Sequence, residues 1–159
     1  MATDIPTFVK DLRPFGGGTP ISYLVSTSVT DLAQGEFVAW DSANRVMRRF
    51  VRDGSAGKFL GISRDSQVGV AKLGNQTALA AANARLSVFT TGVHESTGLA
   101  GETYGHGDSL FMNATSTQSV TKVSAGGTQL GTVYLPEGGT KSGAVKVPML
   151  IDEYTVTQA

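Results

Sequence analysis

The fold is decided by the stretch GEFVAWD (residues 35–41), because its pattern returns later in the chain as GDSLFMN (residues 107–113). Each copy has a glycine, an acidic residue and an apolar run that ends in Asp or Asn. A mixed segment and a glycine-rich turn follow, and each unit ends in a Leu-Gly strand. These repeated strand-and-turn units predict a β domain with a duplicated strand unit at residues 35–63 and 107–134.

The composition agrees with many short strands that are joined by tight turns. The 159 residues include 20 glycines, and charged residues make up only 16% of the chain, against an ordinary share of about 25%. This length suits one domain, or one domain with an arm. We therefore expect a mainly β fold, a β-sandwich or a partly open β-barrel at residues 21–159, with one short helix and an extended N-terminal arm at residues 1–20.

Charge and cysteine content limit the classes of partner. The formal net charge is zero, so no overall field attracts nucleic acid or an anionic membrane, and we expect neither partner. Cysteine is absent, which excludes disulfides and thiol chemistry and fits synthesis in a cytoplasm. The N-terminal sequence lacks the basic and apolar regions of a signal peptide, and no apolar run reaches 18 residues.

Residues 1–20 combine three prolines with a Gly16–Gly18 triplet, so we expect no stable element there. An extended arm with apolar anchors is expected to lie on its own domain or on a neighbouring subunit, and the sequence leaves both open. The apolar anchors of this arm are Phe8, Val9, Leu12 and Phe15.

Beyond the arm, strands are expected near residues 21–29, 36–40, 45–52, 58–63, 85–93 and 144–151. The segment Ser63–Ser66 offers an N-cap for a short helix that Gly74 ends. In the last strand, Val145, Val147, Met149 and Ile151 should share one face. Pro148 has no N–H to donate, so this strand should lie at a sheet edge or break there.

The residues that carry chemistry in enzymes occur here without their usual context. His94 and His106 are the only histidines and lie in separate segments, so we expect no metal site. Ser55 lacks the spacing of a nucleophile elbow. Gly54–Lys58 resembles the end of a phosphate-binding loop, but Phe59 stands where that loop needs a hydroxyl. We therefore predict no catalytic residues and no cofactor.

Arginines form the one basic concentration in the chain, and three of them are candidates for contact with a partner: Arg48, Arg49 and Arg52. Charged side chains on an edge strand also block unwanted strand pairing. We therefore favour a solvated edge, or a contact with an acidic partner surface, over nucleic-acid binding. Trp40, the only tryptophan, is expected in the core or at a subunit interface rather than in a sugar-binding platform.

Several segments together resemble the head decoration, or cement, proteins of tailed bacteriophages. They are GEFVAWD (35–41), KFLGIS (58–63), LSVFTTGV (86–93) and QLGTVY (129–134), before a closing valine-rich strand. The resemblance covers approximately residues 21–151. It implies a β-rich protein without catalysis that forms homotrimers and sits on the outer capsid surface of the virion, where major capsid proteins meet.

On this resemblance we expect a structural protein that bridges and stabilises neighbouring major capsid proteins. A carbohydrate- or ligand-binding β module of a phage tail fibre or adhesin is the alternative, and it needs exposed aromatic residues near Tyr104 and Trp40. A small β-barrel enzyme is a third reading, and it needs converging polar groups that the sequence does not offer.

Overall fold

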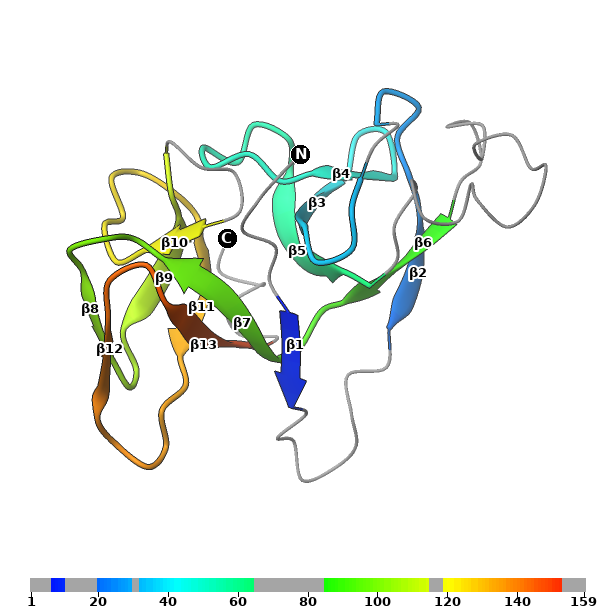
Figure 1. The fold of residues 1–159 in the computed structure, drawn as a ribbon. Coiled ribbons are helices and arrows are strands. Elements are labelled where there is room, and N and C mark those ends of the chain that lie inside the picture. Colours follow the sequence, from blue (N-terminus) through cyan, green and yellow to red (C-terminus); the bar gives the residue numbers. More distant parts are fainter. Residues whose placement is uncertain (1–6, 11–19, 30–31, 65–84, 115–118, 153–159) are drawn as a thin grey trace.

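The structure is a computed structural model that describes residues 7–10, 20–29, 32–64, 85–114 and 119–152. Its described part consists of short strands and connecting turns, which confirms the mainly β class (Figure 1). The strands are β1 (Thr7–Lys10), β2 (Ile21–Leu24), β3 (Phe37–Asp41), β4 (Val46–Arg49), β5 (Lys58–Ser63), β6 (Arg85–Phe89), β7 (Gly92–Gly98), β8 (Thr103–Gly105), β9 (Ser109–Met112), β10 (Ser119–Thr121), β11 (Gln129–Val133), β12 (Thr140–Ser142) and β13 (Lys146–Ile151).

The predicted short helix is not seen in the described residues. Ser63, the first residue of the expected capping segment, is the last residue of β5, where its N–H donates to the Glu36 carbonyl. That ladder bond keeps the backbone extended at the position where a helix was to begin. The rest of the predicted helix, within residues 65–84, lies outside the described residues.

The second half of the chain, β7 to β13, forms a closed five-stranded barrel. The order around the barrel is β7, β10, β9, β11 and β13, and β13 pairs again with β7. All these pairings are antiparallel except that of β10 with β7. The short β8 and β12 pair with each other as a separate two-stranded ribbon. Closure removes the free edges that an open sheet would leave.

The first half, β2 to β6, forms a five-stranded sheet in the order β2-β6-β5-β3-β4. A parallel bridge between Val25 and Met47 brings the chain after β2 next to β4, where the Ser26 N–H donates to the Met47 carbonyl. The two halves lie side by side, with β1 between them in the view of Figure 1. Among the described residues, this bridge is the one backbone pairing between the two edges of the sheet, at β2 and β4.

The two halves share one pairing order. β3 lies between β4 and β5 as β9 lies between β10 and β11, and β6 pairs with β2 as β13 pairs with β7. The sequence units 35–63 and 107–134 therefore contain the equivalent strands β3–β5 and β9–β11.

A glycine in each Leu-Gly strand permits close contact with the next strand. A Cβ on Gly61 would lie 2.1 Å from the Phe89 carbonyl oxygen, and one on Gly131 would lie 2.4 Å from the Leu150 oxygen. The register also shifts beside both glycines, as at a β-bulge. The sequence pattern Leu-Gly is thus required by backbone approach at equivalent positions.

β3 and β5 are buried on both faces. Phe37 and Ala39 belong to an apolar cluster that continues into the second half through Leu110, Leu130 and Met149. Between them Val38 points to the other side, into a cluster made by the first half alone. The same alternation places Phe59 and Leu60 of β5 in different clusters. One core therefore joins the two halves.

The closing strand differs from its prediction. β13 is not an edge strand, because it pairs with both β11 and β7. The Pro148 carbonyl accepts a hydrogen bond from the Tyr134 N–H on the β11 side. In a strand the nitrogen of a residue faces the same edge as its carbonyl, so the missing N–H removes no bond to β7. Val145 lies before the strand and is exposed, whereas Val147, Met149 and Ile151 are buried as expected.

The arm also differs from its prediction, since Thr7–Lys10 forms strand β1. It pairs antiparallel with β7, and Phe8 lies opposite His94. A strand edge supplies the hydrogen bonds that this short segment cannot make alone, and these outweigh the proline- and glycine-rich composition around it. Of the two expected locations, this segment lies on its own domain.

We expect Phe59→Ala to lower the free energy of unfolding by about 3–5 kcal/mol. Phe59 is 1% exposed and makes edge-to-face contacts with Phe37 and Phe50, so truncation leaves a cavity in the core that joins the halves. Chemical denaturation measures the loss. Phe111→Ala, at a half-buried position of β9, is the control and should lose less than half as much. Equal losses would contradict the shared core.

Gly131→Ala should lower the free energy of unfolding by at least about 2 kcal/mol, because the added methyl group meets the β13 backbone rather than a movable side chain. Gly105→Ala is the matched control, since its nearest contact is 3.8 Å away. It should change stability by about 0.5 kcal/mol or less. A Gly131→Ala variant as stable as the control would show that the strands can move apart.

Candidate functional site

The three candidate arginines all bind groups of their own chain. Arg49 donates from Nε and from a terminal nitrogen to Glu36 Oε2, at 3.1 and 3.0 Å. The Glu36 side chain is only 5% exposed, and the same oxygen accepts from the Ala33 N–H. This half-buried ion pair therefore fixes the start of β3 to β4.

Arg48 pairs with Asp41 across the β3–β4 hairpin, at 2.9 Å. Asp41 also closes the turn between β3 and β4, because its carboxylate accepts from the Ala43 and Asn44 N–H groups and from the Asn44 side chain. The Asn44 hydrogen bonds lower the pKa of Asp41, with a smaller contribution from Arg48. About a third of the Arg48 side chain stays exposed, so it can still contact a partner.

Arg52 links the two halves of the molecule. Its guanidinium donates to the Val123 and Ser124 carbonyls, each at 3.3 Å, and its own carbonyl accepts from the Thr128 N–H. The turns after β4 and β10, which are equivalent in the two halves, are thereby joined. A shallow hollow of about 260 Å³ lies here, lined by Val51–Asp53, Ala114 and Ala125–Gly127.

Trp40 lies half-buried at the end of β3. Its ring packs against that of Tyr23, with centroids 5.6 Å apart, and against the apolar cluster of the first half. Of the arm anchors, Phe8 and Val9 lie in β1, whereas Leu12 and Phe15 lie outside the described residues. The predicted contacts of the arm, Trp40 and the arginines with another subunit stay predictions.

The two histidines have separate surroundings. His94 is buried in β7, with its ring 5.7 Å from that of Phe89. His106 accepts the Leu135 N–H at Nδ1 and packs against Tyr134. In the described part of the chain, no group of three His, Asp or Glu side chains is placed to hold a metal ion. The Gly54–Lys58 segment is a turn followed by strand β5 rather than by a helix.

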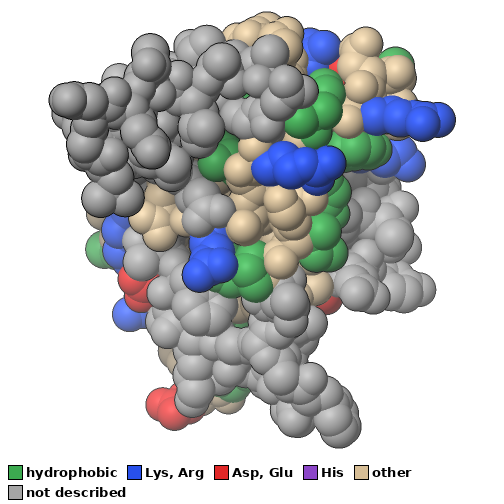
Figure 2. Space-filling view, turned by 90° about the vertical axis from the view of Figure 1, so that its right-hand side faces the viewer, with side chains coloured by type: hydrophobic (Ala, Val, Ile, Leu, Met, Phe, Trp, Pro, Cys, Tyr) green, Lys and Arg blue, Asp and Glu red, His purple; other side chains and the backbone are tan. Residues whose placement is uncertain are grey.

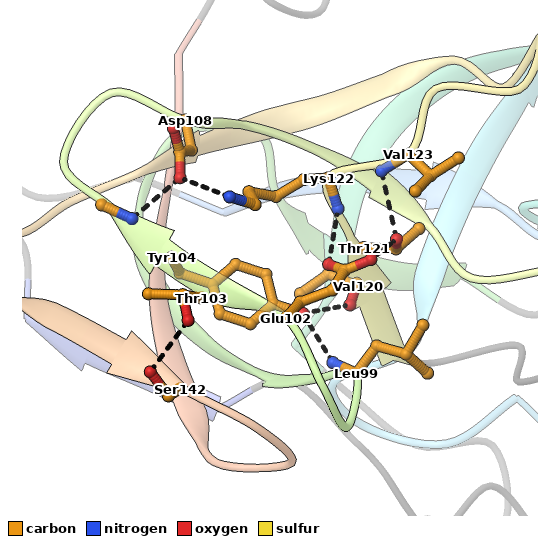
Figure 3. Close-up of polar contacts among 11 residues, drawn as sticks. Leu99, Glu102, Thr103, Tyr104, Asp108, Val120, Thr121, Lys122, Val123 and Ser142 are labelled. Atoms are coloured by element: carbon orange, nitrogen blue, oxygen red, sulfur yellow. Dashed lines mark hydrogen bonds and ion pairs between the residues drawn. The ribbon is translucent and has the colours of Figure 1, made fainter.

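A polar network around Tyr104 escaped sequence reasoning (Figure 3). The Tyr104 hydroxyl accepts the Leu99 N–H at 2.6 Å and donates to the Val120 carbonyl at 3.2 Å. Its side chain has no exposed surface, so Tyr104 itself is not available as an exposed aromatic for sugar binding. A lone aromatic in a turn-rich segment, three residues after Gly101, was the available signal.

Glu102 extends this network to β10. Its carboxylate accepts from the Thr121 hydroxyl and the Lys122 N–H, at 2.5 and 2.9 Å. Burial raises the pKa of Glu102, but these hydrogen bonds outweigh burial and leave it below its usual value. Nearby, the Gly105 N–H lowers the pKa of Asp108, and Lys122 adds to the effect from 3.4 Å. These contacts fasten the β7–β9 connection to the barrel.

A second open hollow, of about 470 Å³, is formed by the segment Tyr134–Lys141 alone. Gly138 and Gly139 in it both have positive φ, at 81° and 85°, so the segment folds back as a turn. The hollow is built from one loop, and its charged side chains are Glu137 and Lys141. We assign it no reaction.

No protein-family model matches the chain, and no curated protein sequence is significantly similar to it. Among the residues that the structure describes, none forms a helix of the length and apolar character required to cross a membrane.

Tyr104→Phe should lower the free energy of unfolding by about 1–2 kcal/mol at neutral pH, because the Leu99 N–H and Val120 carbonyl lose their buried partner. Burial is the main cause that raises the pKa of Tyr104 from 10.0 to about 12. The unfolded chain therefore ionises first, and the wild type should lose stability as the pH rises from 10 through 12. Denaturation across this range should show a flatter dependence for Tyr104→Phe, and equal slopes would contradict the assignment.

Proposed function

We propose that this chain is a structural protein of a viral head that binds the outer capsid surface and bridges neighbouring major capsid proteins. The observation that carries the proposal is strand β1, an N-terminal segment that attaches by edge pairing to β7. A segment that binds an edge of its own domain has the chemistry to bind an edge of a neighbour.

The segments that resemble decoration proteins coincide with framework strands. GEFVAWD contains β3, KFLGIS is β5, LSVFTTGV spans β6 and the start of β7, and QLGTVY contains β11. The resemblance therefore concerns the residues that build the core and the contact between the halves. This supports a common architecture, and the capsid role remains our proposal.

The described surface is suited to weak, repeated contacts. Its candidate arginines are held by Glu36, Asp41 and backbone carbonyls, so each presents an ordered and partly neutralised group. Binding of three linked subunits raises the effective concentration of each contact, so weak contacts suffice in a homotrimer. A trimer should appear in light scattering at three times the chain mass of 16.5 kDa.

The proposal is tested by sedimenting the purified protein with undecorated heads of the virus that encodes it. The full chain should pellet with the heads. Deletion of residues 1–18 should weaken this binding by at least about tenfold, through loss of an edge-pairing segment and of avidity. The barrel of β7, β10, β9, β11 and β13 is closed without β1, so the truncated protein should keep its strand signal in circular dichroism.

Failure of the full chain to pellet would contradict the capsid role. Equal occupancy by the truncated protein would leave the capsid role intact and would contradict the role of the arm. A monomer in light scattering would contradict the trimer.

A further inference from the structure

The two halves match residue by residue along one strand of each half, β7 in the second half and β2 in the first. In the second half, His94 lies opposite Met149, Ser96 opposite Val147, and Gly98 opposite Val120. In the first half, Ile21 lies opposite Val88, Tyr23 opposite Leu86, and Val25 opposite Met47. The same offset of 73 residues relates Ile21 to His94, Val25 to Gly98 and Met47 to Val120. β2 is therefore the counterpart of β7.

The counterpart strands differ in what covers them. One edge of β7 pairs with β13, and its other edge pairs with β1 at residues 93–95 and with β10 at residues 97–98. One edge of β2 pairs with β6. On the other edge, the described residues supply only the contact of Val25 and Ser26 with Met47. The place that β1 fills on β7 has no strand on β2 among the described residues.

The polarity of the side chains on these two strands is the reverse of what their exposure would predict: the buried residues of β7 are polar, and the more exposed residues of β2 are apolar. On the covered edge, His94 and Ser96 are polar and wholly buried. At the equivalent positions on β2, Ile21 and Tyr23 are apolar, yet Ile21 is 48% exposed and Tyr23 is half-buried. Ile21 lies opposite the buried Val88, so it points to the core side of the sheet. An exposed apolar residue beside unpaired backbone groups marks an incomplete sheet edge.

The outer face of the sheet between β2 and β4 is basic. A hollow of about 260 Å³ between β2 and β4 is lined by Leu24–Thr27, Asn44, Val46 and Arg48. Arg45 adjoins it in the β3–β4 turn, and Arg85 lies opposite Leu24. Of these three arginines, Arg48 pairs with Asp41, and no ion pair of Arg45 or Arg85 with a carboxylate is seen among the described residues. Figure 2 shows this side of the molecule, with Lys and Arg side chains next to hydrophobic ones.

We propose that the edge of β2 at residues 21–24 that has no partner strand among the described residues accepts an extended segment of another protein by strand addition. An apolar side chain of that segment covers Ile21, and carboxylates on its other face meet Arg48 and Arg85. Main-chain hydrogen bonds supply affinity in this mode, and alternate side chains supply specificity. The acceptor edge is a property of the fold and does not depend on the capsid role.

The probe is the synthetic peptide acetyl-Asp-Asp-Thr-Phe-Val-Thr-Asp-Asp-amide, added to the full chain. Trp40 reports binding, because it is the only tryptophan and packs on Tyr23 of β2. We expect a saturable change in its fluorescence and slower hydrogen exchange of β2 amides. A peptide of the same sequence with alternate backbone nitrogens methylated cannot complete a ladder and should not bind.

Three variants separate the contributions. Ile21→Asn should weaken peptide binding about tenfold by removing the apolar contact. Val145→Asn, at a residue that is 40% exposed on the other half, is the matched control and should bind normally. Arg85→Gln should weaken binding about threefold and reduce its dependence on salt.

Other occupants of the edge give distinct results. Absence of binding, or equal binding to Ile21→Asn and the wild type, overturns the proposal. A wild-type oligomer that Ile21→Asn dissociates would assign the edge to a second copy, which also overturns it. Ile21→Cys introduces the only thiol of the chain. If that thiol fails to react with a maleimide in the isolated protein, a segment of the same chain already covers the edge, and the proposal falls.

Discussion

Burial of β3 and β5 on both faces is the constraint on which the rest of the structure depends. Most strands of an antiparallel sheet present one face to water, and their sequences alternate. In β3 the consecutive residues Phe37, Val38 and Ala39 are all buried, because successive side chains enter different clusters. The face of β3 and β5 that enters the shared cluster is therefore covered only when the two halves pack together. The Arg52 hydrogen bonds to the second half add a polar link at the same contact between the halves.

The sequence predicted features that depend on local pattern. The run GEFVAWD predicted a strand, and the glycine-rich turn predicted later in the same unit is found after Asp53. It missed features that depend on a distant partner. β1 exists because β7 offers an edge, and Pro148 is tolerated in an inner strand because its nitrogen faces the side where β11 has ended. The residues next to β1 or Pro148 in the sequence do not reveal these distant partner strands.

The arginine cluster shows the same limit at the level of side chains. Its spacing predicted a basic strip, but neighbouring arginines point to opposite faces of β4 and reach different groups. Arg49 reaches Glu36, Arg48 reaches Asp41, and Arg52 reaches backbone carbonyls of the second half. Two of these acceptors lie within the same hairpin and could be guessed from sequence. The third required knowing that the turns after β4 and β10 meet.

The repeated strand order does not determine which segment covers the edge of β7 or of β2. The repeated strands reproduce the framework, but the strand that completes the edge of β7 comes from outside the repeat. Where that edge is covered, the side chains of His94 and Ser96 are wholly buried. Polar residues are thus found at these positions of β7. The equivalent Ile21 and Tyr23 remain apolar on an edge with one partner strand among the described residues. Contact with water does not favour an isoleucine at this position, whereas a strand that covers Ile21 would remove its apolar surface from water and gain free energy.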